Sequence, residues 1–184
     1  MNHQDHVNLI REGVAPGGVS PAPGSLWADL GSGGGAFTLA LADLAGPRVR
    51  ILSLDRDRPA LRAQEQAMRA HFPDRSVEYR LADFTRPQDL PSLDGIVMAN
   101  ALHFIPDRDK PRVLGLLRGY LKPGGRLVLV EYNSDHGNLW VPHPLSYPTW
   151  EKLAGQAGFL QTRRLASVPS RFLNEIYSAL SLTA

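Results

Sequence analysis

A glycine-rich turn and the carboxylates around it are the residues that point most directly to chemistry. Gly31, Gly33 and Gly35 follow the short apolar run Ser25–Leu30, and Asp55 comes about 20 residues later. Glycines between a strand and a helix let backbone N–H groups approach a ligand, because no Cβ atom is in the way. A carboxylate at the distance of Asp55 is where a ribose-binding group is expected. The segment therefore predicts a nucleotide-type ligand.

The turn fits two sequence patterns. Gly31, Gly33 and Ala36 match the G-x-G-x-x-G/A pattern of dinucleotide-binding enzymes, whereas Asp29 with Gly31, Gly33 and Gly35 matches D-x-G-x-G-x-G. The carboxylate of Asp29 would repel a pyrophosphate but suits the cationic amino group of a methionine. The chain after the fifth predicted strand is also too short for a separate substrate domain. These observations favour the second pattern; the alternative is a tight turn that binds nothing.

The D-x-G-x-G-x-G segment resembles the first motif of class I S-adenosylmethionine-dependent methyltransferases. Residues 121–127, L-K-P-G-G-R-L, resemble the turn before the fifth strand in the same family. The resemblance spans roughly Leu26 to Leu182. It implies S-adenosylmethionine as the cofactor, S-adenosylhomocysteine as its product, and methyl transfer to an O, N or C atom of a small molecule.

Hydrophobic periodicity predicts the elements that position these residues. Strands are predicted over 25–30, 49–54, 77–81, 95–99, 126–130, 160–168 and 176–182, and helices over 36–44, 57–71, 110–121 and 149–157. Alternating strands and helices predict an α/β fold, a doubly wound and mostly parallel seven-stranded sheet with helices on both faces. The last two strands have no helix between them and predict a C-terminal antiparallel hairpin. The resemblance implies the same Rossmann-like methyltransferase fold.

The 184 residues predict a single domain. Its expected parts are an N-terminal helix or lid with a Gly/Pro-rich loop (1–24), a cofactor-binding core (25–132), a substrate-side loop (133–149), and a C-terminal helix with the hairpin (150–184). In the family, the segment before the first strand often lies over the cofactor. Without a ligand we expect residues 3–12 to fray.

The resemblance assigns the cofactor to residues that follow the first four strands. They are Asp29, Gly31, Gly33 and Gly35 at the methionine portion, Asp55 or, as a fallback, Asp57 at the ribose hydroxyls, Asp83 and Phe84 at the adenine, and Asn100 at the methionine end. The alternative for Asp55 is a helix-entry carboxylate paired with Arg56 or Arg58. The alternative for Asp83 is an ordinary loop aspartate.

Methyl transfer is an in-line displacement, so alignment of the reactants supplies much of the acceleration and no fixed catalytic residue is required. His103, three residues after Asn100, is the best candidate for a general base. The alternative is a loop histidine that packs between Leu102 and Phe104. The segment after Asn100 lacks the N-P-P-Y pattern of enzymes that methylate amino groups of nucleic acids, which favours a small-molecule acceptor.

The loop after the fifth strand mixes titratable, aromatic and proline residues, as the rim of a binding site would. The substrate-side candidates are Glu131, Tyr132, Asn133, Trp140 and His143. The alternative is a crossover loop in which Trp140 is buried against the sheet. We expect no metal site, because a loop containing Asp135, His136 and His143 fixes no coordination geometry.

Composition excludes several other classes of protein. The sequence has no cysteine, which rules out thiol catalysis, disulfides and Cys-ligated metals. The net charge of +2 is too small to indicate a nucleic-acid partner. No apolar run is long enough for a membrane span, so we expect a cytoplasmic protein without a membrane partner.

Two alternative functions stay open. One is a binding module without turnover, and the other is an RNA or protein methyltransferase. A homodimer could cover the substrate edge of the sheet.

Overall fold

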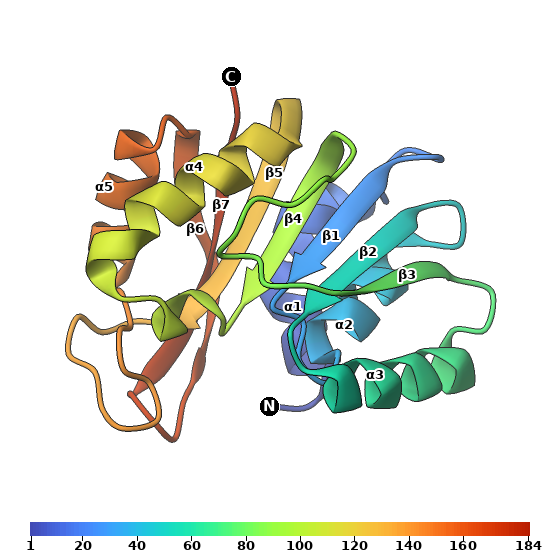
Figure 1. Ribbon diagram of the computed structural model, residues 1–184, viewed down its shortest axis with the longest axis horizontal. Coiled ribbons are helices and arrows are strands. Elements are labelled where there is room, and N and C mark those ends of the chain that lie inside the picture. Colours follow the sequence, from blue (N-terminus) through green and yellow to red (C-terminus); the bar gives the residue numbers. More distant parts are fainter.

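The computed structural model describes all 184 residues and has one seven-stranded sheet between two layers of helices (Figure 1). The strands are β1 (Leu26–Leu30), β2 (Arg50–Asp55), β3 (Ser76–Leu81), β4 (Leu93–Ala99), β5 (Leu121–Tyr132), β6 (Leu160–Pro169) and β7 (Glu175–Leu182). The helices are α1 (His3–Val14), α2 (Ala36–Ala45), α3 (Arg58–His71), α4 (Lys110–Tyr120) and α5 (Tyr147–Gln156).

The strand order is β3-β2-β1-β4-β5-β7-β6. Strands β1 to β5 pair in parallel, and β7 is antiparallel to both of its neighbours. The predicted fold class, including the C-terminal hairpin, is confirmed. The order reverses between β1 and β4, so the carboxyl ends of the parallel strands form one edge with a crevice at the reversal, which is where ligands bind in such sheets.

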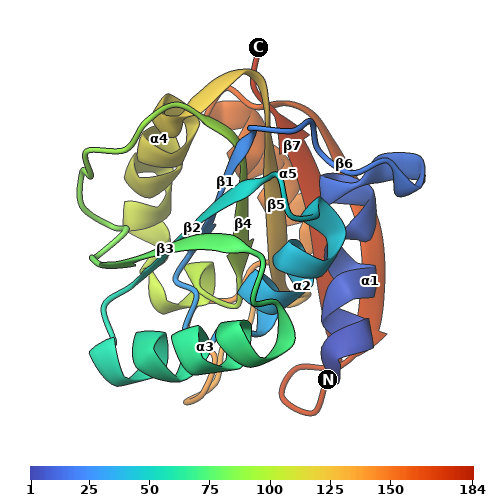
Figure 2. The same ribbon diagram turned by 90° about the vertical axis from the view of Figure 1, so that its right-hand side faces the viewer.

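Helices cover both faces of the sheet (Figure 2), and each face has its own hydrophobic core. Successive residues of a strand point to opposite faces. Trp27 of β1 therefore lies in the core beneath α1 and α2, while its neighbour Ala28 lies in the core beneath α4 and α5. No helix is both long enough and apolar enough to cross a membrane.

Two elements differ from their predicted form. Strand β5 begins at Leu121 rather than Arg126, because Leu121 already pairs with Leu93 of β4. Helix α1 begins at His3, in the segment that was expected to fray, and has a capping box. The side chain of Asn2 accepts from the backbone N–H of Asp5 while the side chain of Asp5 accepts from the N–H of Asn2, and the helix buries Val7, Ile10 and Val14. Fraying was expected because a weak apolar pattern does not reveal a capping box.

A buried polar cluster connects the sheet to α2 and α3. The hydroxyl of Thr38 on α2 donates to Asp29 of β1 at 2.6 Å, and the amide of Gln64 on α3 donates to that hydroxyl at 2.9 Å. Ser53 of β2 donates to the amide oxygen of Gln64 at 2.6 Å. Asp29 is fully buried, and this burial raises the pKa of its carboxyl to about 7.

Gly95 of β4 allows the closest packing within the sheet. It pairs with Trp27 of β1, and a Cβ atom at this position would lie against the indole ring closer than van der Waals contact. We expect Gly95→Ala to lower the free energy of unfolding by roughly 1–3 kcal/mol in urea titrations, because an overpacked core must shift. Gly115→Ala, at an open position of α4, is the matched control and should stabilise the protein slightly. Equal effects of the two substitutions would contradict this packing.

The buried carboxyl of Asp29 should make stability depend on pH. Its pKa is about 7 in the folded protein, above the value of about 3.9 in an unfolded chain. The folded state therefore holds an extra proton between these values, and stability falls as the pH rises from about 4 to 7. The free-energy difference between Asp29→Asn and the wild type should grow across this range, by up to ~4 kcal/mol. A pH-independent difference, like that expected for the exposed Asp89→Asn, would contradict the assignment.

Candidate cofactor site at the carboxyl edge

A cavity of about 770 Å³ opens at the carboxyl ends of β1 to β4. This volume lies within the range of small-molecule sites, about 300–1,000 Å³. Its walls come from the turn after β1, the first turns of α1, α2 and α3, and the segments that follow β2, β3 and β4. The lining residues used below are His6, Gly31, Gly33, Phe37, Leu39, Asp55, Arg56, Asp57, Asp83, Phe84, Asn100, Phe104 and Ile105.

The glycine turn is tied to the end of β2. The N–H groups of Gly31 and Ser32 donate to the carbonyl of Leu54 at 2.9 and 3.1 Å. Gly31 has a φ of 75°, and a Cβ atom there would collide with the side chains of Phe84 and Ala101. Glycine is therefore required at this position both for its backbone conformation and for the close approach.

Asp55 also attaches the glycine turn to the end of β2. Its Oδ2 accepts from the N–H of Gly33 at 2.7 Å, and its Oδ1 accepts from the N–H of Asp57 at 2.8 Å. Asp57 instead caps α3, because its side chain accepts from the N–H of Ala60 at 3.0 Å. Both carboxylates line the cavity, but Asp55 is the one that joins the turn to the strand end.

Asp83 and Phe84 line the cavity after β3. The carboxylate of Asp83 accepts from the hydroxyl of Thr85 at 2.6 Å and from its N–H at 2.9 Å. The hydroxyl bond holds the pKa of Asp83 below its usual value, so the group is ionised at neutral pH.

Asn100 follows β4 and has a left-handed backbone with a φ of 51°, which asparagine tolerates better than most residues. Its side-chain oxygen Oδ1 is buried and has no hydrogen-bond partner in the protein. A buried polar atom without a partner is unfavourable unless a ligand or water completes it. The residue lines the cavity, but this oxygen lies beneath the cavity surface and is not reached from it.

Two of the glycine-motif residues lie outside the cavity. Asp29 is buried beneath the turn with Thr38. Gly35, with a φ of 86°, caps the start of α2 and packs against Gln64. Both residues hold the turn in place from below.

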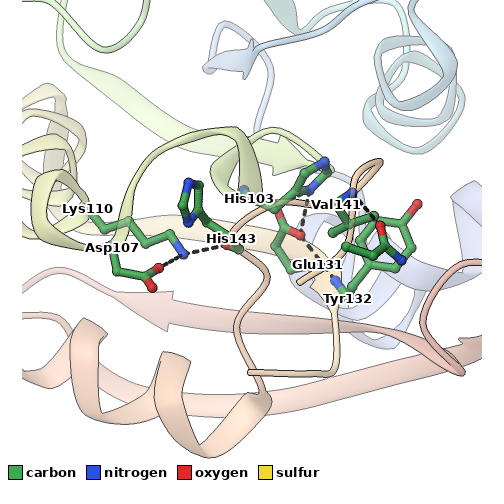
Figure 3. Close-up of polar contacts among 8 residues, drawn as sticks. His103, Asp107, Lys110, Glu131, Tyr132, Val141 and His143 are labelled. Carbon is green, nitrogen blue, oxygen red and sulfur yellow. Dashed lines mark hydrogen bonds and ion pairs between the residues drawn. The ribbon is translucent and has the colours of Figure 1, made fainter. Parts of the chain in front are cut away.

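His103 and Glu131 form a buried pair beside the cavity (Figure 3). The carboxylate of Glu131 lies 2.9 Å from Nδ1 of His103 and also accepts from the backbone N–H groups of His103 and Tyr132. The second ring nitrogen points away from Glu131 (Figure 3). The His103 ring packs against Phe104, with centroids 4.2 Å apart. Phe104 lines the cavity, whereas His103 does not.

A buried lysine fixes the loop after β5 to this pair (Figure 3). Lys110 of α4 is 2% exposed, and its ammonium donates to the carbonyl of His143 and to the carboxylate of Asp107, both at 2.6 Å. The N–H of His143 donates in turn to the carbonyl of His103 at 3.0 Å. The loop is thereby anchored next to the histidine.

The other substrate-side candidates do not line the cavity either. The Asn133 side chain donates to Glu175 at 2.6 Å and accepts from the N–H of Tyr147 at 2.9 Å, which closes the base of the loop. Tyr132 is buried against His103. Trp140 is 70% exposed, so it is not buried against the sheet.

Sequence reasoning missed the aromatic and basic residues of the wall. Phe37, Phe104 and Arg56 line the cavity although no motif marks them. His6 also lines it, from α1. Unlike these three residues, His6 was indicated by the sequence, because the N-terminal segment with His3, His6 and Arg11 was expected to lie over the cofactor and to contribute to substrate binding.

Comparisons with known proteins agree with this geometry. A family model described as "Methyltransferase domain" matches residues 28–127. The chain is 36% identical over 110 residues to the carboxy-S-adenosyl-L-methionine synthase of Shewanella amazonensis, which covers 59% of this chain and 45% of that protein. The chain thus spans about half the length of the curated relatives it matches.

Two solved structures show the same fold. One is an S-adenosylmethionine-dependent methyltransferase of Methanosarcina mazei, with a TM-score of 0.71 and 18% identity over 89% of this chain and 94% of that chain. The other is human N-acetylserotonin methyltransferase in complex with S-adenosylmethionine, with a TM-score of 0.69 and 19% identity over 100% of this chain and 52% of that chain. The family match covers more than half of the residues, and so this chain belongs to the class I S-adenosylmethionine-dependent methyltransferase family.

Proposed function

We propose that this chain binds S-adenosylmethionine in the cavity and transfers its methyl group to a small molecule. One observation carries the proposal: the residues that the family resemblance assigns to the cofactor, except Asp29 and Gly35, converge on a single cavity. The turn after β1, Asp55 after β2, Asp83 after β3 and Asn100 after β4 all line it. Few ligands other than an adenosine joined to an amino acid would need all four.

The nucleoside is assigned to the carboxylates. Asp55 has two oxygens for the two adjacent hydroxyls of a ribose, and it is held at the turn by the N–H of Gly33. The ionised Asp83 would accept from the adenine amino group, with Phe84 beside the ring. The adenine would then lie toward β3.

The methionine portion is assigned to the turn and to Asn100. The turn presents Gly31 and Gly33 to the cavity without Cβ atoms, so backbone can approach the ligand closely. Asn100, which follows β4 and lines the cavity, would face the methionine end through its backbone carbonyl.

Methyl transfer fits the cavity better than the formation of a carboxylated S-adenosylmethionine. S-Adenosylmethionine supplies a methyl group on a positively charged sulfur, and the acceptor displaces the sulfur in line. The name of the Shewanella relative indicates an enzyme that makes carboxy-S-adenosyl-L-methionine, a product that carries a carboxylate. All charged side chains of this cavity follow β2 or β3, so a carboxylate near β4 would have no cation beside it. Burying a carboxylate without a counter-ion costs free energy, and this supports methyl transfer as the reaction.

His103 is the proposed general base. Its Nδ1 faces Glu131, which would hold the ring in one orientation and stabilise the imidazolium formed when the other nitrogen takes a proton. The ring packs against the exposed Phe104, and the proposal requires Phe104 to turn aside so that this nitrogen reaches the cavity. Glu131 is a positioning residue in this proposal.

The ribose assignment is tested by calorimetric titration with S-adenosylhomocysteine. Asp55→Ala should weaken binding by about tenfold or more, since two hydrogen bonds to a charged group are lost and the turn is loosened. The exposed Asp89→Ala serves as the control and should bind like the wild type. Unchanged affinity in Asp55→Ala would overturn the cofactor site, and a larger loss in Asp57→Ala would move the ribose to that residue.

Activity is tested by transfer of a labelled methyl group from S-adenosylmethionine to fractions of a small-molecule cell extract. The wild type should label at least one small molecule. Glu131→Gln and His103→Asn should each reduce the rate by roughly 10²-fold while S-adenosylhomocysteine still binds, and the double variant should be no slower than either single one. No labelling despite tight cofactor binding would indicate a binding module, and full activity of both variants would remove His103 from the mechanism.

A further inference from the structure

The cavity has one charged end and one uncharged end. The four lining side chains that carry a formal charge are Asp55, Arg56, Asp57 and Asp83, which all follow β2 or β3. The larger lining side chains toward α1, α2 and the end of β4 are His6, Phe37, Leu39, Asn100, Phe104 and Ile105. Because the proposed nucleoside occupies the charged end, the methyl acceptor must enter the uncharged end.

His6 belongs to the uncharged end because its ring is neutral at neutral pH. Burial, together with the nearby N-terminal amine, lowers the pKa of His6 below its usual value, against a smaller opposing effect of Asp5. The ring stands edge-on to Phe37, with centroids 4.9 Å apart. Helix α1 thus contributes a flat, uncharged ring to the cavity wall.

Phe104 provides a second flat surface at the uncharged end. It is 60% exposed although it lines the cavity, and on its other side it packs against the His103 ring. An exposed aromatic side chain at the mouth of a cavity offers a face on which a planar ligand can stack.

We propose that the methyl acceptor is an uncharged, planar aromatic molecule that binds against Phe104, Phe37 and the neutral ring of His6. An ionised acceptor would lose its hydration without gaining a counter-ion, and a saturated ring would lose the stacking contacts. This inference rests on the proposed function, since it places the cofactor at the charged end. It adds the chemical class of the acceptor.

The test uses three probes of similar size: 2-naphthol, which is neutral at pH 7, 2-naphthoate, which is an anion, and decahydro-2-naphthol, which is not planar. Each is titrated calorimetrically into the wild-type protein saturated with S-adenosylhomocysteine. We expect 2-naphthol to bind about tenfold or more tightly than either of the other two. The prior titration with S-adenosylhomocysteine shows separately whether the cofactor site exists.

Substitutions at the uncharged end test whether 2-naphthol binds there. Phe104→Ala should weaken 2-naphthol binding by about tenfold, whereas Phe172→Ala, which removes an equally exposed ring outside the cavity, should leave it unchanged. His6→Lys places an ammonium at the uncharged end and should reduce or reverse the preference for 2-naphthol over 2-naphthoate. Retained affinity for S-adenosylhomocysteine shows that each variant is folded.

Three results would overturn the proposal while leaving the proposed function intact. The first is equal binding of the three probes, and the second is an equal effect of Phe104→Ala and Phe172→Ala. The third is an unchanged preference for 2-naphthol over 2-naphthoate in a His6→Lys variant that still binds S-adenosylhomocysteine, which would place His6 away from the acceptor.

Discussion

The attachment of the glycine turn to the end of β2 is the interaction on which the site depends. Two backbone bonds to Leu54 and one to the carboxylate of Asp55 bring the turn after β1 against the neighbouring strand. The same carboxylate accepts from the start of the α3 segment at Asp57. Because Gly31 has no Cβ atom, Phe84 and Ala101 can pack directly on the turn, so the segments after β3 and β4 close the cavity around it.

Polar side chains support the glycine turn from beneath. The buried pair of His103 and Glu131 beside the cavity is held by packed neighbours. Asp29, Thr38 and Gln64 join the strand to α2 and α3 inside the protein, which fixes the helix whose first residues form the cavity wall. Across the cavity, Lys110 ties the loop after β5 to His103. The division of the cavity into a charged and an uncharged end follows from topology, because the ends of β2 and β3 lie on one side of β1 and the end of β4 lies on the other.

The sequence predicted the architecture well and the substrate side poorly. Strand and helix positions follow from apolar periodicity, and the carboxylates after β2 and β3 converge because the carboxyl ends of parallel strands meet at one edge. Side-chain direction is set by tertiary packing that no local pattern encodes. Asn133 was expected to contact the substrate, but its side chain closes the base of a loop. Trp140 was also expected on the substrate side, but it is exposed and does not line the cavity. Phe104 was expected only as a packing partner of His103, although it lines the cavity.

A crystal structure of the protein with S-adenosylhomocysteine tests the central claim most directly, because it locates every part of the cofactor at once. The account predicts that the ribose hydroxyls contact Asp55, that the adenine lies beside Phe84, and that the sulfur faces the end of the cavity walled by His6 and Phe104. A ligand bound in the reverse direction, with its sulfur toward Asp83, or bound outside this cavity, would contradict the account.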